Sequence, residues 1–318
     1  MLLKAIYICI FCIQLSAGQF HETSVEFHVK ENSPFGTVIG DVSTASGGQI
    51  RPPFFLLDSS VPDSLDFDLD SGRITVIGNL DRETSSSFSL LALYAEEGNI
   101  VKIVIRITDE NDNSPKFDPP SFNLTISEST PVPKCWPLPT ARDADEGANG
   151  VVRCEMIEPN FNFEISYNHE NSELNLCLKS ELDFETFQNH SISILAIDGG
   201  GKSALLSVTV QIIDENDHVP IFEAPKYEFS FKRLGYHNGQ AIAHLHAIDQ
   251  DSGHNGEVKY SISSRLNSSF PFSIDENNGD IIVSNLPIPI GSFSFVVKAY
   301  DQGNPSLESE VPVFIRVL

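Results

Sequence analysis

Apolar and polar residues alternate along much of the chain with a period of two. Clear examples are residues 101–107, 122–126 and 207–212, where β-branched residues are frequent at the apolar positions. Such alternation is typical of half-buried strands, and turn-forming residues interrupt the runs about every 8–12 positions. No stretch has a convincing helical periodicity. The pattern therefore predicts an all-β protein whose short strands form β-sandwiches.

The chain also repeats itself at a spacing of roughly one hundred residues. The motif Asp-Glu-Asn-Asp-Asn at 109–113 returns as Asp-Glu-Asn-Asp-His at 214–218, and a proline and a phenylalanine follow each copy. Three further motifs return in the same order: residues 80–83 at 182–185, residues 143–150 at 249–256, and residues 196–198 at 299–301. One such motif is weak evidence, but an ordered set that recurs predicts tandem domains.

This combination of motifs resembles the extracellular repeats of the cadherin superfamily. The resemblance covers essentially the whole chain after residue 18 and implies tandem Greek-key β-sandwich repeats at residues 19–113, 114–218 and 219–318. Cadherins that exchange N-terminal strands carry a tryptophan near the mature N-terminus, whereas the single tryptophan here is Trp136. The repeats are therefore more similar to those of protocadherins or Fat/Dachsous proteins. The chain resembles the membrane-distal part of a longer ectodomain, or a truncated product.

The chain is strongly acidic, with a formal net charge of −24. This charge argues against nucleic acid and anionic lipid as partners. Disorder is not expected, because 41% of the residues are hydrophobic and 22 of them are Phe, which is enough apolar side chain to build cores. The acidic residues are therefore expected to gather at particular places.

The repeated acidic motifs have the composition of a calcium site. Ca²⁺ takes about 6–8 oxygen ligands, mainly carboxylates and carbonyls, and short motifs on turns bring several oxygens together. No single repeat has a full set, so a site is expected to close only where one repeat meets the next. The resemblance implies about three Ca²⁺ ions in each of two linkers, and each linker gathers eight carboxylates.

The resemblance also implies the ligands residue by residue. In the first linker it implies side-chain oxygens from Glu31, Asp81, Glu83, Asp109, Asn111, Asp112, Asp143, Asp145 and Asp198, and backbone carbonyls from Glu110, Asn113 and Asn149. In the second linker it implies side-chain oxygens from Glu128, Asp183, Glu185, Asp214, Asn216, Asp217, Asp249, Asp251 and Asp301, and carbonyls from Glu215, His218 and Asn255. His218 stands where the family usually has Asn, with little expected effect because the implied contact is through the backbone. Without metal the carboxylates repel one another and the linker is expected to bend; with metal the repeats form a stiff rod.

The outer ends of the first and third repeats depart from the pattern. Arg233 aligns with Glu128, and residues 286–291 lack the Leu-Asp-x-Glu motif. A linker to any following repeat is therefore expected to bind fewer calcium ions or none. In the first repeat, residues 41–45 replace the Asp-x-Asp motif and Glu97 replaces an aspartate, as expected for an outermost repeat.

The first 18 residues have the layout of a secretory signal peptide. Lys4 precedes an apolar stretch at 5–15, and small residues follow at 16–18. No later segment has ~18 consecutive apolar residues. The expected location is the extracellular face of the plasma membrane, or the extracellular medium if residue 318 is the natural C-terminus. An uncleaved N-terminal anchor is the alternative.

Secretion makes disulfides and glycosylation relevant. Cys135, Cys154 and Cys177 remain after the signal peptide, so at most one internal disulfide is expected and its pairing is open. Acceptor sequons for N-glycosylation begin at Asn123, Asn189 and Asn267. Trp136 is expected to pack in or beside the core of the second repeat, and Phe20 is not expected to anchor an exchanged strand.

Calcium-dependent cell–cell adhesion or recognition is the expected function, with a cadherin on an apposed cell, most simply a homophilic one, as partner. A secreted or truncated non-adhesive product, or a heterophilic receptor or ligand in signalling, is the alternative. An enzyme is not expected: the acids recur in register at every repeat junction, no nucleophile, base and pocket converge, and the nine His residues lack metalloenzyme spacing. No small-molecule substrate is expected either.

Overall fold

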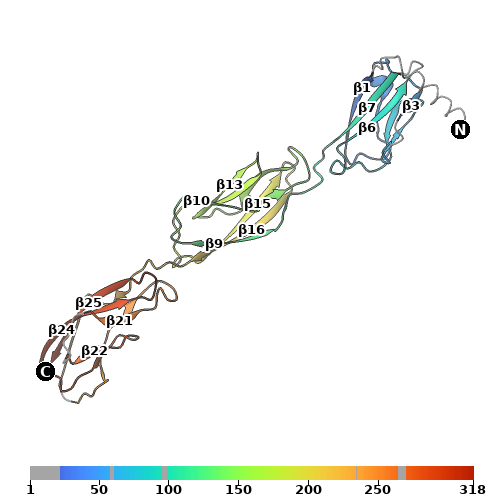
Figure 1. Cartoon of the computed structure of the whole chain (residues 1–318). Helices are drawn as coiled ribbons and strands as arrows, with labels where there is room; N and C mark the ends of the chain where they lie inside the picture. Colours follow the sequence, from blue (N-terminus) through green and yellow to red (C-terminus); the bar gives the residue numbers. More distant parts are fainter. Residues whose placement is uncertain (1–21, 58–60, 95–98, 234, 264–269) are drawn as a thin grey trace, which may run out of the picture.

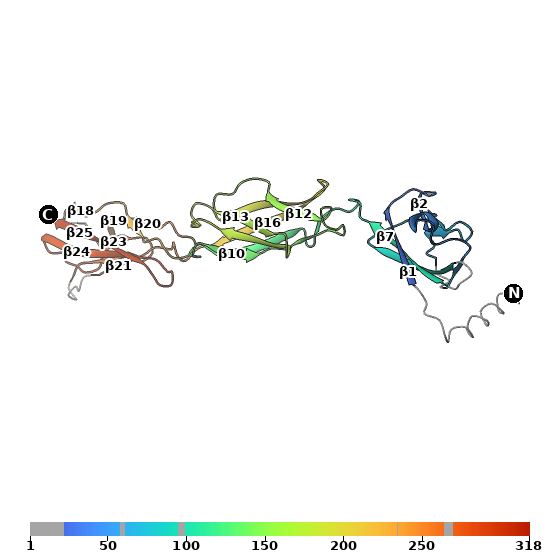
Figure 2. The ribbon, with the colours of Figure 1, turned by 90° about the horizontal axis from the view of Figure 1, so that it is seen from above.

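The computed structural model describes residues 22–57, 61–94, 99–233, 235–263 and 270–318. Three β-sandwiches follow one another end to end along an extended chain (Figures 1 and 2). The predicted all-β fold of tandem Greek-key sandwiches is confirmed. The signal peptide at 1–18, Phe20, Glu97 and the Asn267 sequon lie outside the described residues.

The first sandwich packs a four-stranded sheet against a three-stranded sheet. The larger sheet has the order β1 (Glu22–Lys30), β7 (Asn99–Thr108), β6 (Ser87–Tyr94) and β3 (Phe54–Leu56), and the smaller has β2 (Val38–Asp41), β5 (Arg73–Val76) and β4 (Leu65–Phe67). The first and last strands pair in parallel, with Val25 opposite Ile103. Their parallel pairing delivers the end of β1 and the end of β7 to the same end of the sandwich.

The second sandwich has the same plan. Its larger sheet has the order β12 (Val151–Met156), β15 (Asn189–Asp198), β16 (Ser203–Ile213) and β9 (Ser121–Ser127), and its smaller sheet has β10 (Lys134–Pro137), β14 (Glu173–Leu178) and β13 (Phe163–Asn168). A short ladder joins β11 (Ala141–Arg142) to β8 (Lys116–Phe117). The predicted strands at 101–107, 122–126 and 207–212 lie inside β7, β9 and β16.

The third sandwich repeats the arrangement once more. Its sheets are β18 (Tyr227–Phe231), β25 (Glu308–Val317), β24 (Gly291–Tyr300) and β21 (Lys259–Ile262), then β19 (Ala241–His244), β23 (Asp280–Val283) and β22 (Phe272–Ile274), with a ladder of β17 (Ile221–Phe222) and β20 (Ala247–Ile248). In the part of the chain that the structure describes, the one helix is α2 (Val42–Ala45), and no helix is long and apolar enough to cross a membrane.

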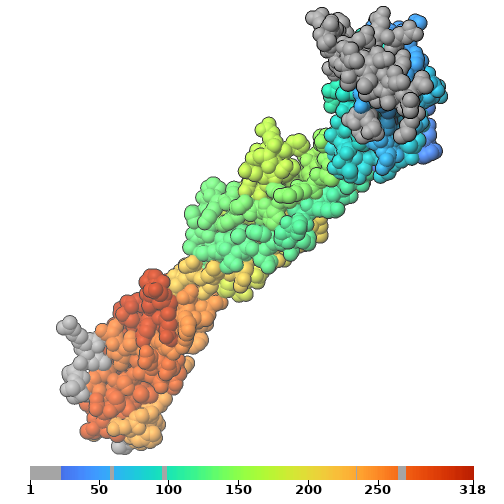
Figure 3. Space-filling model, turned by 45° about the vertical axis from the view of Figure 1, so that its right-hand side comes forward, coloured from blue at the N-terminus to red at the C-terminus, as the bar shows by residue number. Residues whose placement is uncertain are grey.

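Each sandwich has its own hydrophobic core, built from the inward residues of both sheets. In β16 the alternate residues Leu206, Val208, Val210 and Ile212 are at most 2% exposed. Burying side chains of this size contributes about 1.5–3 kcal/mol each before chain entropy is counted. Trp136 packs against the second core, as predicted. Among the described residues, none of these cores extends into a neighbouring sandwich. The space-filling view shows the three units following one another along the chain (Figure 3).

One disulfide, Cys135–Cys177, joins neighbouring residues on the antiparallel strands β10 and β14. This agrees with the prediction of at most one internal disulfide, and the register of these two strands selects the pair that the sequence left open. Closing a loop with a sequence separation of 42 residues stabilises the fold by about 4 kcal/mol in the chain-entropy account. The remaining thiol, Cys154, is half-buried, and burial raises its pKa to about 11, so it is a weak nucleophile.

Candidate metal sites at the two junctions

A buried glutamate organises the first junction. Glu31 follows β1 directly and is 1% exposed. One of its carboxylate oxygens accepts a hydrogen bond from the backbone N–H of Glu110 at 2.6 Å, and the other accepts one from the backbone N–H of Arg82 at 2.9 Å. This carboxylate therefore ties together the end of the first strand, the segment 80–83 and the connecting segment 109–113.

The connecting segment 109–113 is held against the top of the second sandwich. Asp109 accepts hydrogen bonds from the side chain of Asn149 at 2.8 Å and from the backbone of Glu146 at 3.1 Å. Asn113 donates from its backbone and its side chain to the buried carboxylate of Asp145, at 3.1 and 2.8 Å. The predicted ligands from both sides of the junction are thus brought together.

The second junction repeats this frame bond for bond. Glu128 accepts hydrogen bonds from the backbone N–H of Glu215 at 2.7 Å and of Phe184 at 2.6 Å. Asp214 accepts from the side chain of Asn255 at 2.8 Å, and Asp251 accepts from the backbone N–H of His218 at 3.2 Å. The periodicity in the sequence therefore corresponds to a periodicity in three-dimensional hydrogen bonding.

Buried oxygens without a partner gather at both junctions. Among the described residues, every buried side-chain N or O atom that lacks a hydrogen bond, except Ser43 Oγ, is an oxygen of a predicted ligand. These atoms are Asn111 Oδ1, Asp143 Oδ2, Asp198 Oδ2, Asn216 Oδ1, Asp249 Oδ2 and both carboxylate oxygens of Glu185. A buried polar group without a partner is costly, and its presence calls for an explanation such as an ion.

Within the described ranges, four groups of side chains bring possible ligand atoms within 4.8 Å of one another: Glu31, Glu83 and Asp109; Glu83, Asp112 and Asp145; Glu128, Asp183 and Glu185; and Glu185, Asp217, His218 and Asp251. All lie at the junctions and all consist of predicted residues. The remaining predicted carboxylates, Asp81, Asp143, Asp198, Asp214, Asp249 and Asp301, lie outside these groups.

Burial of these acids changes their pKa values. Burial, followed by repulsion from neighbouring carboxylates, raises the pKa of Asp143 and of Asp249. The pKa of Glu185 rises to about 7, mainly through burial and then through the charge on Glu128. Hydrogen bonds from Thr84 and Thr186 instead lower the pKa values of Asp81 and Asp183. A bound cation would favour the ionised form of the buried acids.

Arg82 is an important residue to which the sequence assigned no role. Its side chain is 6% exposed and inserts between the acids of the first junction. The guanidinium contacts Asp109, donates to Glu83 Oε1 at 2.5 Å and to the carbonyl of Ala144 at 2.7 Å, and pairs with Glu146 at 2.8 Å. The Leu-Asp-Arg-Glu motif shows that a cation stands among these acids. It does not show that the arginine side chain turns into the junction.

Two glycines were missed as well. A Cβ atom added to Gly200 would lie 2.4 Å from Asn111 Nδ2, and one added to Gly303 would lie 2.3 Å from Asn216 Cγ. Both asparagines are predicted ligands, so these glycines allow the connecting segments to approach the following sandwich closely. In the sequence, a glycine that recurs shortly after Asp198 and after Asp301 could have indicated this role.

The outer ends differ as the sequence indicated. Arg233 donates its backbone N–H to Leu318 O, as Glu128 does to Ile213 O, and its side chain is exposed. A cation thus takes the structural position of a buried glutamate. At the other end, Asp41 accepts a hydrogen bond from Thr44 N and caps α2. Of the described sequons, Asn123 and Asn189 are exposed on β9 and β15.

Comparison with known proteins agrees with this geometry. The family model for the cadherin domain matches residues 122–213 and 235–318, and that for the FAT4-like N-terminal cadherin-like domain matches residues 21–109. The chain therefore belongs to the cadherin superfamily. Cadherins are adhesion receptors, so the chain is not an enzyme.

Within that superfamily the chain is protocadherin-like. It is 30% identical to protocadherin alpha-8 of Pan troglodytes, over 96% of this chain and 33% of that protein, and 29% identical to protocadherin-17 of Homo sapiens, over 96% and 29%. The crystal structure of protocadherin gamma C5 EC1-3 superposes with a TM-score of 0.81 and 26% identity, covering 92% of this chain and 100% of that one. The chain spans about a third of the length of the curated relatives it matches.

Proposed function

We propose that the chain is a calcium-dependent cell-adhesion segment, made of cadherin repeats at residues 19–113, 114–218 and 219–318. The observation that carries this proposal is the set of buried, partnerless oxygens at both junctions. Oxygen atoms of carboxylates and amides are the ligands that Ca²⁺ prefers, so the residues present fit that ion. The extracellular face of the plasma membrane is the proposed location.

The proposed ligands are the two sets of residues listed in the sequence analysis. The first set begins with Glu31 and ends with Asp198, and the second begins with Glu128 and ends with Asp301. About three ions per junction would supply +6 against eight carboxylates. Bound calcium would supply positive charge that offsets the mutual repulsion of these acids. The chain's own residues then hold neighbouring sandwiches in one relative orientation.

Removal of calcium tests this proposal directly. Small-angle scattering and thermal melting are measured with calcium and with a chelator. We expect a more compact, more variable particle and a lower melting temperature in the chelator, because the carboxylates are left in mutual repulsion. An unchanged maximum dimension and melting temperature would refute the proposal.

The adhesive partner is proposed to be a second cadherin, most simply another copy of the same protein. The relatives are protocadherins, and no tryptophan stands near the N-terminus for strand exchange. Self-association of this segment is expected to be no tighter than micromolar, about −8 kcal/mol. Analytical ultracentrifugation should show a dimer that tolerates deletion of residues 19–20 and disappears in a chelator. A dimer that is lost on deletion of residues 19–20 but persists in a chelator would indicate strand exchange.

A further inference from the structure

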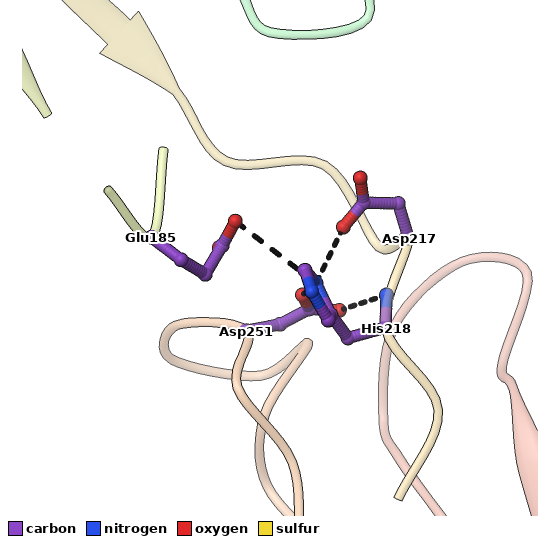
Figure 4. A group of neighbouring side chains, drawn as sticks. All are labelled: Glu185, Asp217, His218 and Asp251. Atoms are coloured by element: carbon purple, nitrogen blue, oxygen red, sulfur yellow. Dashed lines mark hydrogen bonds and ion pairs between the residues drawn. The ribbon is translucent and has the colours of Figure 1, made fainter. Parts of the chain in front are cut away.

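The second junction contains an imidazole ring where the first junction has an asparagine side chain. His218 takes the position of Asn113 at the end of the connecting segment, and its ring turns inward among three carboxylates (Figure 4). Nδ1 lies 2.7 Å from Asp217 Oδ1, 2.8 Å from Asp251 Oδ1 and 4.0 Å from Glu185 Oε2. The sequence alone suggested that only the backbone carbonyl of this residue would matter.

The ring nitrogen faces more acceptors than it can satisfy. One N–H serves a single acceptor well, whereas two carboxylate oxygens lie at hydrogen-bond distance and a third lies close by. The Asp251 side chain is 0% exposed. Both oxygens of Glu185 are buried and have no hydrogen-bond partner among the described residues. These oxygens belong to the same set that supports calcium binding, and they indicate that a cation belongs between the four side chains without identifying the ion.

We propose that His218 Nδ1, Glu185, Asp217 and Asp251 form a site for a nitrogen-preferring divalent ion of the zinc class. One imidazole and three carboxylates are donors that Zn²⁺ accepts, and four is its usual coordination number. The site goes beyond the proposed calcium function but rests on it in one respect, because the three carboxylates are also proposed calcium ligands.

The spacing of the donor atoms fits such an ion with small adjustments. A tetrahedral zinc with ligands at about 2.0–2.2 Å separates its donors by about 3.3 Å. The four donor atoms all lie within 4.8 Å of one another. The distances from His218 Nδ1 to Asp217 and Asp251 are shorter than the zinc value, and the distance to Glu185 is longer. The His218 side chain is 33% exposed, which leaves an entry path from solvent.

The first junction provides the matched comparison. Glu83, Asp112 and Asp145 form the equivalent acidic group, and Asn113 replaces the histidine. This group offers oxygen alone, which suits calcium better than zinc. Selectivity for zinc is therefore expected to reside in one side chain of the second junction.

Zinc titration of calcium-free protein by calorimetry tests the site. The wild type should bind one Zn²⁺ ion that His218→Asn binds at least about 100-fold more weakly, since loss of even an outer-shell partner costs 10–100-fold. Asn113→His should gain a second such ion. Co²⁺ in place of Zn²⁺ should give a visible absorption band that His218→Asn lacks.

The double variant His244→Gln/His246→Gln is the control, because it removes two exposed, stacked imidazoles that lie outside the proposed site. It should retain the tight ion. Equal zinc affinity and stoichiometry in wild type and His218→Asn would overturn the site, as would loss of the ion in the control variant.

Calcium titration separates the two proposals. The His244→Gln/His246→Gln variant should keep wild-type calcium binding, and thermal melting of His218→Asn in a chelator should match the wild type, which shows that this variant is folded. If the wild type bound zinc through His218 but no calcium, the proposed calcium function would fail while the zinc site stood.

Discussion

The two junctions share one hydrogen-bonded frame but differ at particular side chains, and the residue after the first aspartate of the Leu-Asp-x-Glu motif is one of them. Arg82 and Phe184 occupy the same position in the repeated motif, and the backbone N–H of each is held by a buried glutamate. The Arg82 side chain turns into the junction and contacts acids of both sandwiches, whereas Phe184 packs against the second core. The first junction therefore contains a cation of its own, and the second does not have one at this position.

The electrostatic consequence appears in the paired glutamates. Burial raises the pKa values of both Glu83 and Glu185, but the positive charge of Arg82 opposes the rise in Glu83. Glu185 has a pKa of about 7, and the charge that opposes its rise is the more distant His218. The stability of the two junctions is therefore expected to depend on bound metal to different degrees, although their ligand sets are similar.

The largest expected effect is the loss of a ligand shared between the sandwiches. Asp112→Ala should weaken calcium binding at the first junction, and Asp217→Ala at the second, each on the order of 100-fold and each without effect on the other junction. Each change removes a ligand that no neighbour replaces. Calcium titration with a stoichiometry count is the measurement. A single variant that matched the wild type would show the ligand assignment to be wrong.

Arg82→Phe should make the first junction resemble the second. In a chelator this variant should have a free energy of unfolding lower than the wild type by roughly 2 kcal/mol. This loss is smaller than that expected for a fully buried ion pair, because Glu146, one partner of Arg82, is largely exposed. Denaturant unfolding measures it. Arg153→Phe, at an exposed arginine paired with Glu155, is the control and should change stability by about 0.5 kcal/mol or less. Equal effects would remove the distinction between the junctions.

Phe184→Arg is the reciprocal change. An arginine that turned into the second junction would compete with bound calcium, and we expect about tenfold weaker binding there, ~1.4 kcal/mol. Phe184→Leu controls for lost packing and should retain calcium affinity. If both variants lost affinity equally, packing rather than charge would account for the result.

The smallest effect is expected where the side chain is not a calcium ligand. Asn113→His and His218→Asn should each leave calcium affinity within about twofold, since the proposed contact uses the backbone carbonyl. Isothermal calorimetry on both variants checks this. A larger change at either position would mean that the side chain takes part in calcium binding.

The candidate sites could be predicted largely from sequence because the acidic motifs recur in order. In the part of the chain that the structure describes, every acidic group that is brought together consists of residues implied by the resemblance, although Glu31 and Glu128 lie outside the recurring motifs. Arg82, Gly200 and Gly303 were not predicted, because their roles depend on contacts with residues far away in the chain. The motif likewise could not predict that the His218 ring points inward.

The sequence by itself determined the all-β class, the repeat and the acidic composition of the junctions, since period-two alternation and turn motifs are local properties. Tertiary structure decided which cysteines pair, through the register of β10 and β14. It also decided that Arg82 turns toward acids and Phe184 toward the core. Such choices depend on which partners each side chain meets across the fold, and sequence neighbours do not specify them.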